Sequence, residues 1–173
     1  MTKVTIRHAT NADHDAIWRI FREVIAAGET YPLDPKASRE DALAYWFQRD
    51  AHVFVAENND EIIGSYTVHS NHPAGGAHVA NAAFIVAHNA RGQGIGRAMG
   101  EHCLAEARRL GFHAMQFNFV VSTNESAVKL WQNLGMQIVG TLPDAFRHPT
   151  RGYVDVYVMF QSFLPTNHAN KRE

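Results

Sequence analysis

A glycine-rich segment, residues 91–96 with the sequence RGQGIG, lies between an apolar run and a helical pattern. Backbone N–H groups at the N-terminus of a helix form an anion site, and the helix dipole adds to it. Glycines at positions 92, 94 and 96 would let those N–H groups approach a phosphate closely. A tight strand-to-helix turn is the alternative, but three glycines at alternate positions exceed what a turn requires. The segment therefore predicts phosphate binding.

The spacing of this segment excludes two common phosphate motifs. A Walker A loop needs Gly-Lys-Ser/Thr five positions after its first glycine, where Arg97 follows Gly92. A Rossmann fingerprint needs a further glycine, but Arg97 and Met99 occupy the two candidate positions. The segment is therefore a phosphate loop of another kind.

Two asparagines interrupt otherwise apolar strands, Asn81 in VANAAFIV and Asn118 in MQFNFVV. A buried amide is unfavourable unless it is hydrogen-bonded. Each amide could mend an irregularity of its own strand, or it could contact a bound molecule. Two such amides together favour a role in substrate binding.

Histidine and cysteine offer weaker candidates for chemistry. His69, His72 and His78 flank the loop NHPAGGA, and eleven histidines are scattered through the chain, so surface histidines are favoured over a metal site. We expect no bound metal. Cys103 lies on the apolar stripe of a predicted helix, which favours a core thiol over a nucleophile.

These residues depend on the elements around them, which apolar periodicity predicts in the order β-α-α-β-β-β-α-β-α-β-β. Thr10 and Asp13 resemble a capping box before the first helix, Gly28 ends that helix, and Ser38 caps the second. The helix after the glycines is expected to reach about residue 110, and a further helix is expected over 124–134. Strands are expected at 3–9, 52–58, 62–70, 78–87, 114–122, 136–142 and 153–160, with a loop at 143–152. The strand at 78–87, apolar on both faces apart from Asn81, should be central in a mixed α/β sheet.

Length and composition set limits on the class of protein. The 173 residues suit one domain, predicted over 1–164, followed by a polar tail over 165–173. A net charge of −1 gives no electrostatic footprint for nucleic acid or an anionic membrane. We find no signal peptide or membrane span, and one cysteine excludes an internal disulfide, so we expect a cytoplasmic protein.

The segment RGQGIG is similar to the acyl-CoA signature Arg/Gln-x-x-Gly-x-Gly/Ala of the GNAT superfamily of acetyltransferases. IRHATNADHDAI, FIVAHNARGQGIG and NESAVKLWQNLGM also resemble the first strand and helix, the central strand and loop, and the late helix of that family. The resemblance implies a mostly antiparallel sheet of about seven strands with about four helices, whose central strands splay at the acyl-CoA site. It implies acetyl-CoA as the cosubstrate.

The resemblance also implies roles for individual residues. The backbone N–H of Val86 would polarise the thioester carbonyl, and Asn124 would bond the pantetheine near the thiol. The pantetheine arm would pair with the strand at Phe84, Ile85 and Val86. The CoA pyrophosphate would be held by the loop residues Arg91, Gly92, Gln93, Gly94, Ile95, Gly96 and Arg97.

The chain departs from the family where many relatives carry a tyrosine that protonates the leaving thiolate, because Trp131 lies there. An indole N–H donates a hydrogen bond but does not usefully give up its proton. Tyr66 and Tyr153 are candidates to replace that acid. We place Trp131 among the cofactor-binding residues.

A narrower resemblance, carried by NAAFIV, FNFVVSTN and KLW, is to the proline-analogue (azetidine-2-carboxylate) acetyltransferases. It implies that Asn81 and Asn118 lie in the acceptor cleft. Two loops that wall the acceptor site in the family make Glu29, Tyr31, Arg147 and His148 candidates for specificity, although solvated loop residues are the favoured interpretation.

The sequence therefore predicts an N-acetyltransferase that acts on a small-molecule amine, such as an amino acid or proline analogue, by direct attack in a ternary complex. A protein or peptide acetyltransferase and a non-catalytic CoA-binding sensor are the alternatives. We expect no nucleic-acid or membrane partner, and the sequence leaves open whether the protein forms a homodimer.

Overall fold

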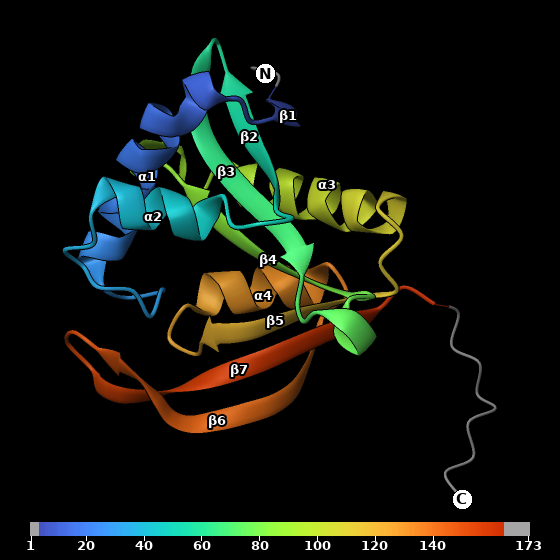
Figure 1. Ribbon diagram of the computed structural model, residues 1–173. Coiled ribbons are helices and arrows are strands. Elements are labelled where there is room, and N and C mark those ends of the chain that lie inside the picture. Colours follow the sequence, from blue (N-terminus) through green and yellow to red (C-terminus); the bar gives the residue numbers. More distant parts are fainter. Residues whose placement is uncertain (1–3, 165–173) are drawn as a thin grey trace, which may run out of the picture.

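Alternating apolar residues build one mixed sheet of seven strands in the computed structural model, which describes residues 4–164 (Figure 1). The strand order is β1-β2-β3-β4-β5-β7-β6, and every neighbouring pair except β4 and β5 is antiparallel. The strands are β1 (Thr5–His8), β2 (His52–Asn58), β3 (Glu61–Ser70), β4 (Val79–Val86), β5 (Ala114–Val121), β6 (Gln137–His148) and β7 (Gly152–Ser162). The predicted fold class and the central place of β4 are both confirmed.

Four helices follow the predicted pattern: α1 (His14–Ala27), α2 (Arg39–Trp46), α3 (Ile95–Arg109) and α4 (Glu125–Asn133). A 3-10 turn at Asn11–Asp13 precedes α1, and the Thr10 N–H donates to Asp13 Oδ2 at 2.7 Å, as the capping-box pattern predicts. Gly28, in the left-handed region with φ of 65°, ends α1. Glycine adopts this conformation without a Cβ penalty.

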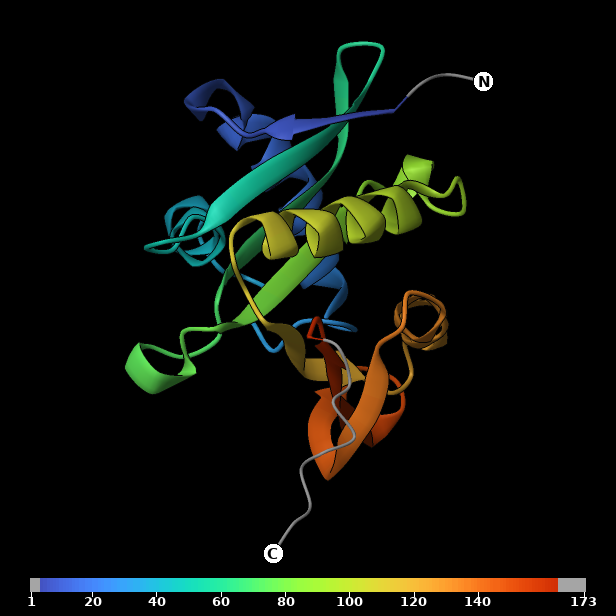
Figure 2. The same ribbon diagram turned by 90° about the vertical axis from the view of Figure 1, so that its right-hand side faces the viewer.

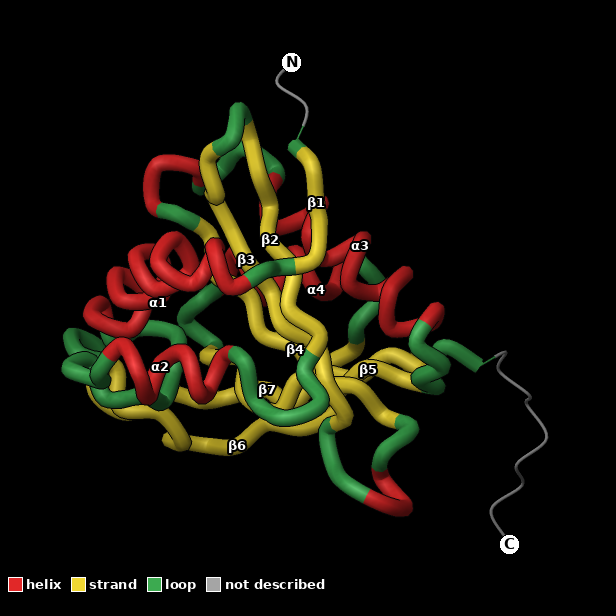
Figure 3. Tube along the Cα trace, turned by 45° about the horizontal axis from the view of Figure 1, so that its top comes forward, coloured by secondary structure: helices red, strands yellow, loops and turns green. Residues whose placement is uncertain are grey.

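The helices divide between the two faces of the sheet (Figures 1 and 3). Apolar residues of α1 and α2 pack against one face in one core cluster, which includes Ile17, Phe21 and Trp46. α3 and α4 pack against the other face, and the four residues Ile95, Met99, Cys103 and Ala107 form the predicted stripe of α3. Figure 2 shows α3 lying across that second face. No helix within residues 4–164 is long and apolar enough to cross a membrane.

The two central strands separate soon after they meet. β4 pairs with β5 only at Val79–Ala114 and Ala80–Met115, whereas β3 stays paired with β4 from Ser70 to Gly64. The register between β5 and β7 also shifts between Phe117 and Val120. Because β4 beyond residue 80 has no strand on one side, its outer backbone edge is available to other groups.

The loop predicted over 143–152 is wrong for residues 143–148, because β6 continues to His148, and only a turn at 149–151 separates it from β7. The sheet accommodates Pro143 through a register shift between Leu142 and Phe146, where Asp144 has a φ of 54°. A bulge tolerates proline because it needs no ladder N–H there. The predicted tail over 165–173 lies outside the described residues.

Candidate active site

A cavity of about 870 Å³ occupies the space between the diverging strands. Its lining includes residues of β4 from Asn81 to Val86 and of β5 from Phe117 to Val121. The glycine-rich loop and α4 also line the cavity, as do the segment before α2 and the turn between β6 and β7. The glycine-rich loop and the polar strand residues therefore share a single cavity.

The glycine-rich loop leads directly into α3. Gly92 and Gly94 have φ values of 74° and 82°, the left-handed region that favours glycine. The first intrahelical bond runs from the Ala98 N–H to the Gly94 carbonyl at 3.0 Å, so the N–H groups before Ala98 lack helical acceptors. Residues 91–97 line the cavity apart from Gln93, whose side chain donates to the Asn89 carbonyl at 2.8 Å.

The exposed edge of β4 is partly occupied by Tyr31. The Tyr31 hydroxyl donates to the Phe84 carbonyl at 2.8 Å and accepts from the Phe84 N–H at 3.0 Å. Burial raises the pKa of the Tyr31 phenol, which therefore stays protonated. Phe84, Ile85 and Val86 all line the cavity. Since peptide groups two residues apart face the same way along a strand, Val86 presents its N–H and C=O to the same edge as Phe84.

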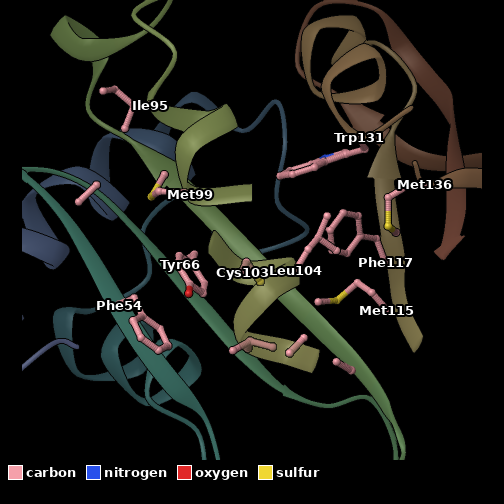
Figure 4. Packing of buried hydrophobic residues seen from close by; sticks show 14 of the residues in the cluster. Phe54, Tyr66, Ile95, Met99, Cys103, Leu104, Met115, Phe117, Trp131 and Met136 are labelled. Carbon is pink, nitrogen blue, oxygen red and sulfur yellow. The ribbon is translucent and has the colours of Figure 1, made fainter. Parts of the chain in front are cut away.

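Trp131 and Asn124 enter the cavity from α4. Trp131 is 8% exposed, and its ring lies 4.7 Å from that of Phe84. It also lies 4.9 Å from the ring of Phe117, and Figure 4 shows these two side chains together. Asn124 caps α4, because its Oδ1 accepts from the Ala127 N–H at 3.4 Å. Its amide N–H groups remain available for a ligand.

Neither tyrosine considered as a replacement acid lines this cavity. The Tyr66 hydroxyl is bonded to His102 Nδ1 at 2.6 Å on the α3 face of the sheet. Tyr153 is 68% exposed on β7. Both were candidates by residue type alone, and neither has its side chain in the cavity.

The two strand asparagines both line the cavity, and both hold hydrogen bonds within the protein. Asn81 Oδ1 accepts from the Ala82 N–H at 2.8 Å. Asn118 Oδ1 accepts from Gln116 at 2.8 Å, and its Nδ2 donates to Asn71 Oδ1 at 2.6 Å. Each amide keeps further donor or acceptor capacity, so these contacts leave room for a ligand.

Sequence reasoning missed many of the residues that line the cavity, among them Thr67 and Arg151, and assigned His69 to the protein surface. Thr67 and His69 both lie on β3 and line the cavity, with Thr67 opposite Ala83 and His69 opposite Asn81. The period of two along β3 places them on one face, which is the signal that could have found them. His72 and His78 do not line the cavity, and no group of three metal-ligating side chains occurs among the described residues.

The wall of the cavity beyond the asparagines includes Glu29, Tyr31 and His148, whereas Arg147 lines a separate cavity of about 320 Å³. The Thr150 N–H donates to His148 Nδ1 at 3.2 Å, so the neutral ring carries its proton on Nε2. Cys103 is buried in α3, where burial raises the pKa of its thiol, and it does not line the cavity.

Comparison with known proteins agrees with this arrangement. Residues 15–136 match the model of the acetyltransferase (GNAT) family, so the chain belongs to that family. It is similar to a GCN5-related N-acetyltransferase from Kribbella flavida, with 46% identity and a TM-score of 0.88 over 92% of this chain and 97% of that one. The chain is an acetyl-CoA-dependent N-acetyltransferase.

Two curated relatives extend the comparison. The N-acetyltransferase aca1 of Schizosaccharomyces pombe is 30% identical, over 82% of this chain and 76% of that protein. The L-methionine sulfoximine/L-methionine sulfone acetyltransferase of Salmonella typhimurium is 26% identical, over 81% of this chain and 84% of that protein. The fold is also shared with yncA of Salmonella typhimurium, solved with acetyl-CoA, at 24% identity and a TM-score of 0.84 over 95% of this chain and 96% of that one.

Proposed function

We propose that this enzyme transfers the acetyl group of acetyl-CoA to the amine of a small amino-acid-like acceptor, by direct attack in a ternary complex. The observation that carries the proposal is the single cavity of about 870 Å³ that joins the glycine-rich loop to the polar residues of β4 and β5. Two reactants held in one cavity react without a diffusional encounter. Cys103 lies outside that cavity, so no cysteine acyl-enzyme is required.

The proposed acyl-CoA site consists mainly of backbone groups. The N–H groups of Ile95, Gly96 and Arg97 receive the pyrophosphate at the positive end of α3. Because Tyr31 holds Phe84, the pantetheine arm pairs with β4 mainly through Val86, whose N–H polarises the thioester carbonyl.

Trp131 and Asn124, which line the same end of the cavity, contact the arm near its sulfur. The Trp131 indole N–H donates a hydrogen bond there but does not serve as an acid.

The acceptor side favours a small zwitterion. Asn81 and Asn118 provide amide groups, His148 provides the N–H of its Nε2, and Arg151 provides a cation for a carboxylate. The cavity is also lined by the segment before α2 and by the β6–β7 turn, and walls from two segments suit a compact acceptor better than a peptide chain. The amino-acid sulfone and sulfoximine named for the Salmonella relative support the same class of acceptor.

A panel of acceptors assayed for CoA release tests the proposal. Amino acids, proline analogues and methionine sulfone should give turnover, whereas polyamines and peptides should give little. Equal or higher kcat/KM with peptides would replace this proposal by a peptide acetyltransferase. Tight acetyl-CoA binding without CoA release from any amine would indicate a sensor instead.

A further inference from the structure

The backbone groups of β4 alternate between its two edges. The Asn71 N–H donates to the carbonyl of Val79, the first residue of β4, at 2.8 Å, so the odd-numbered residues of β4 present their N–H and C=O groups to β3. The even-numbered residues face the gap that opens toward β5 beyond residue 80. Residues 82, 84 and 86 all line the cavity, and this free edge is where their backbone groups point.

Tyr31 is the first side chain bonded to this free edge as one moves along β4 away from Val86. Its hydroxyl donates to the Phe84 carbonyl at 2.8 Å and accepts from the Phe84 N–H at 3.0 Å. The Ala82 N–H, two residues further, is taken by Asn81 Oδ1 at 2.8 Å. Because two residues of a strand span about 6.8 Å, a thioester oxygen bound at the Val86 N–H lies roughly that far from the Tyr31 hydroxyl.

Tyr31 and Trp131 reach Phe84 from opposite faces of the sheet. The Tyr31 ring packs edge-on against Phe21 of α1, with 5.6 Å between the ring centres. Trp131 of α4 packs on the Phe84 ring at 4.7 Å, within the cluster on the other face (Figures 1 and 3). Since the proposed function places Trp131 beside the sulfur, an amine can approach the thioester on the Tyr31 side while the thiolate leaves toward Trp131.

The Tyr31 hydroxyl keeps room for one more hydrogen bond. A phenol has one donor hydrogen and two lone pairs; Phe84 takes the hydrogen and its N–H takes one lone pair, so one lone pair remains. Burial raises the pKa of this phenol, so the oxygen stays protonated and does not act as a base. What it can still do is accept a hydrogen bond from the N–H of a neutral amine.

We propose that the Tyr31 hydroxyl positions the attacking amine, by accepting one of its N–H groups while the nitrogen lone pair points at the thioester carbon; this proposal rests on the proposed function. Reacting atoms about 3–3.5 Å apart are in near-attack geometry, and a hydrogen bond spans about 3 Å. One nitrogen can therefore bridge the roughly 6.8 Å between the Tyr31 hydroxyl and the bound thioester.

The proton and bond changes are those of direct transfer. The acceptor ammonium first loses a proton to water, which leaves a neutral nitrogen with a lone pair. That nitrogen forms the N–C bond, the C–S bond breaks, and sulfur leaves as a thiolate. The proton that the nitrogen then loses converts the thiolate to the CoA thiol. Tyr31 exchanges no proton in these steps and acts only through its hydrogen bond.

Tyr31→Phe is the first test, because it removes the hydroxyl and keeps the ring against Phe21. We expect kcat for the amine to fall about tenfold or more, since the near-attack geometry is lost. Acetyl-CoA affinity, measured by calorimetry, should not weaken, because the Phe84 N–H and C=O become free to pair with the pantetheine. Tyr153→Phe is the matched control: Tyr153 is 68% exposed and does not line the cavity, so its variant should keep the wild-type kinetics.

Replacing Tyr31 by p-aminophenylalanine separates positioning from a purely structural role. The amino group can donate to the Phe84 carbonyl and accept from the Phe84 N–H, but its single lone pair is then used, and its second hydrogen cannot accept from the substrate. The melting temperature should stay near that of the wild type, whereas kcat should fall as it does in Tyr31→Phe. A wild-type kcat in this variant would overturn the proposal, because the bonds to Phe84 alone would then suffice.

The outcomes distinguish this proposal from the one on which it rests. An active wild type with an unchanged kcat in folded Tyr31→Phe overturns the role of Tyr31 alone. Weaker acetyl-CoA binding in that variant also overturns it, because Tyr31 would then belong to the donor site. A wild type that releases no CoA with any amine overturns the proposed function and the positioning role together. If Tyr31→Phe does not fold, the p-aminophenylalanine variant decides.

Discussion

Asn118 connects three parts of the molecule through its side chain. It accepts from Gln116 on its own strand and donates to Asn71 in the segment after β3, while it also lines the cavity. The contacts hold the amide in one orientation, because both ends are bonded. A preoriented amide loses little entropy when a substrate binds to its remaining donor and acceptor positions.

Asn118→Ala should lower kcat/KM for the amine between about twofold and a hundredfold, since lost hydrogen bonds to a polar substrate are worth about 0.5–3 kcal/mol. Acetyl-CoA affinity should barely change. Gln116→Ala is the control, because it removes the same internal bond at a residue that does not line the cavity. If both variants lose stability equally and acetylate normally, Asn118 is structural and leaves the proposed site.

Residue type and spacing predicted the residues whose role depends on the local backbone. The loop over 91–97 and the amides Asn81 and Asn118 stand out because glycines and amides are unusual in their settings. Thr67 and His69 do not, because threonine is common in strands and histidine near a loop is common at surfaces. Whether they line the cavity depends on which strand face borders it, and that follows only from the tertiary arrangement.

At the scale of elements, the glycine-rich loop leads into the N-terminus of α3, where the helix dipole is positive and the first helical residues line the cavity. Gly94 has a φ of 82°, and a Cβ added there would meet nothing within 4 Å. A substitution at Gly94 therefore strains the backbone even though space is available. This strain means that a variant of Gly94 needs a control with the same strain elsewhere.

Gly94→Ala and Gly111→Ala form that matched pair. Gly111, directly after α3, has a φ of 87° and equally open space, but it does not line the cavity. Each variant should lose about 1 kcal/mol of stability from the left-handed conformation. Calorimetry should show weakened acetyl-CoA binding for Gly94→Ala only. Equal affinities in the two variants would remove the loop from the cofactor site.

Helices were predictable because their apolar stripes and caps are local signals, and all four follow the expected pattern. The continuation of β6 through Pro143 was not predictable in the same way. Proline, aspartate and glycine normally indicate a turn, and only the pairing of β6 with β7 on both sides of the bulge keeps the segment extended. Long-range pairing thus outweighed the local turn residues.

At the scale of the whole molecule, the mixed sheet follows from the order of its elements, but the separation of β4 from β5 does not. The resemblance to the family implied that separation, whereas periodicity alone gives no measure of how far two strands stay paired. The cavity, and therefore the function, depends on that feature of the assembled sheet. Stability of the sheet is accordingly a condition for the site.

The edge strand β1 is held to the rest of the sheet by an ionic network as well as by β2. Arg7 of β1 donates to Asp13 Oδ2 at 2.8 Å and contacts Glu57 of β2 at 2.8 Å. The hydrogen bond from the Arg7 guanidinium, helped by hydrogen bonds from Thr10, lowers the pKa of Asp13 from 3.8 to about 2, although burial of the carboxyl acts in the opposite direction. A lowered folded-state pKa stabilises the fold above the unfolded value, and that stabilisation is lost as the pH falls from about 4 to about 2.

Asp13→Asn should therefore lose about 1–2 kcal/mol of unfolding free energy at pH 7, a value reduced for the solvent screening of partly exposed Arg7. Urea unfolding at pH 7, 4, 3 and 2 should show the difference from the wild type shrinking by that amount between pH 4 and pH 2, because the wild-type carboxylate becomes protonated. Asp15→Asn is the control, since Asp15 pairs with Arg39 while its side chain is 88% exposed, and its variant should keep the wild-type pH dependence. A constant difference between Asp13→Asn and the wild type from pH 7 to pH 2 would show that the network contributes through hydrogen bonding or packing and not through the charge of Asp13.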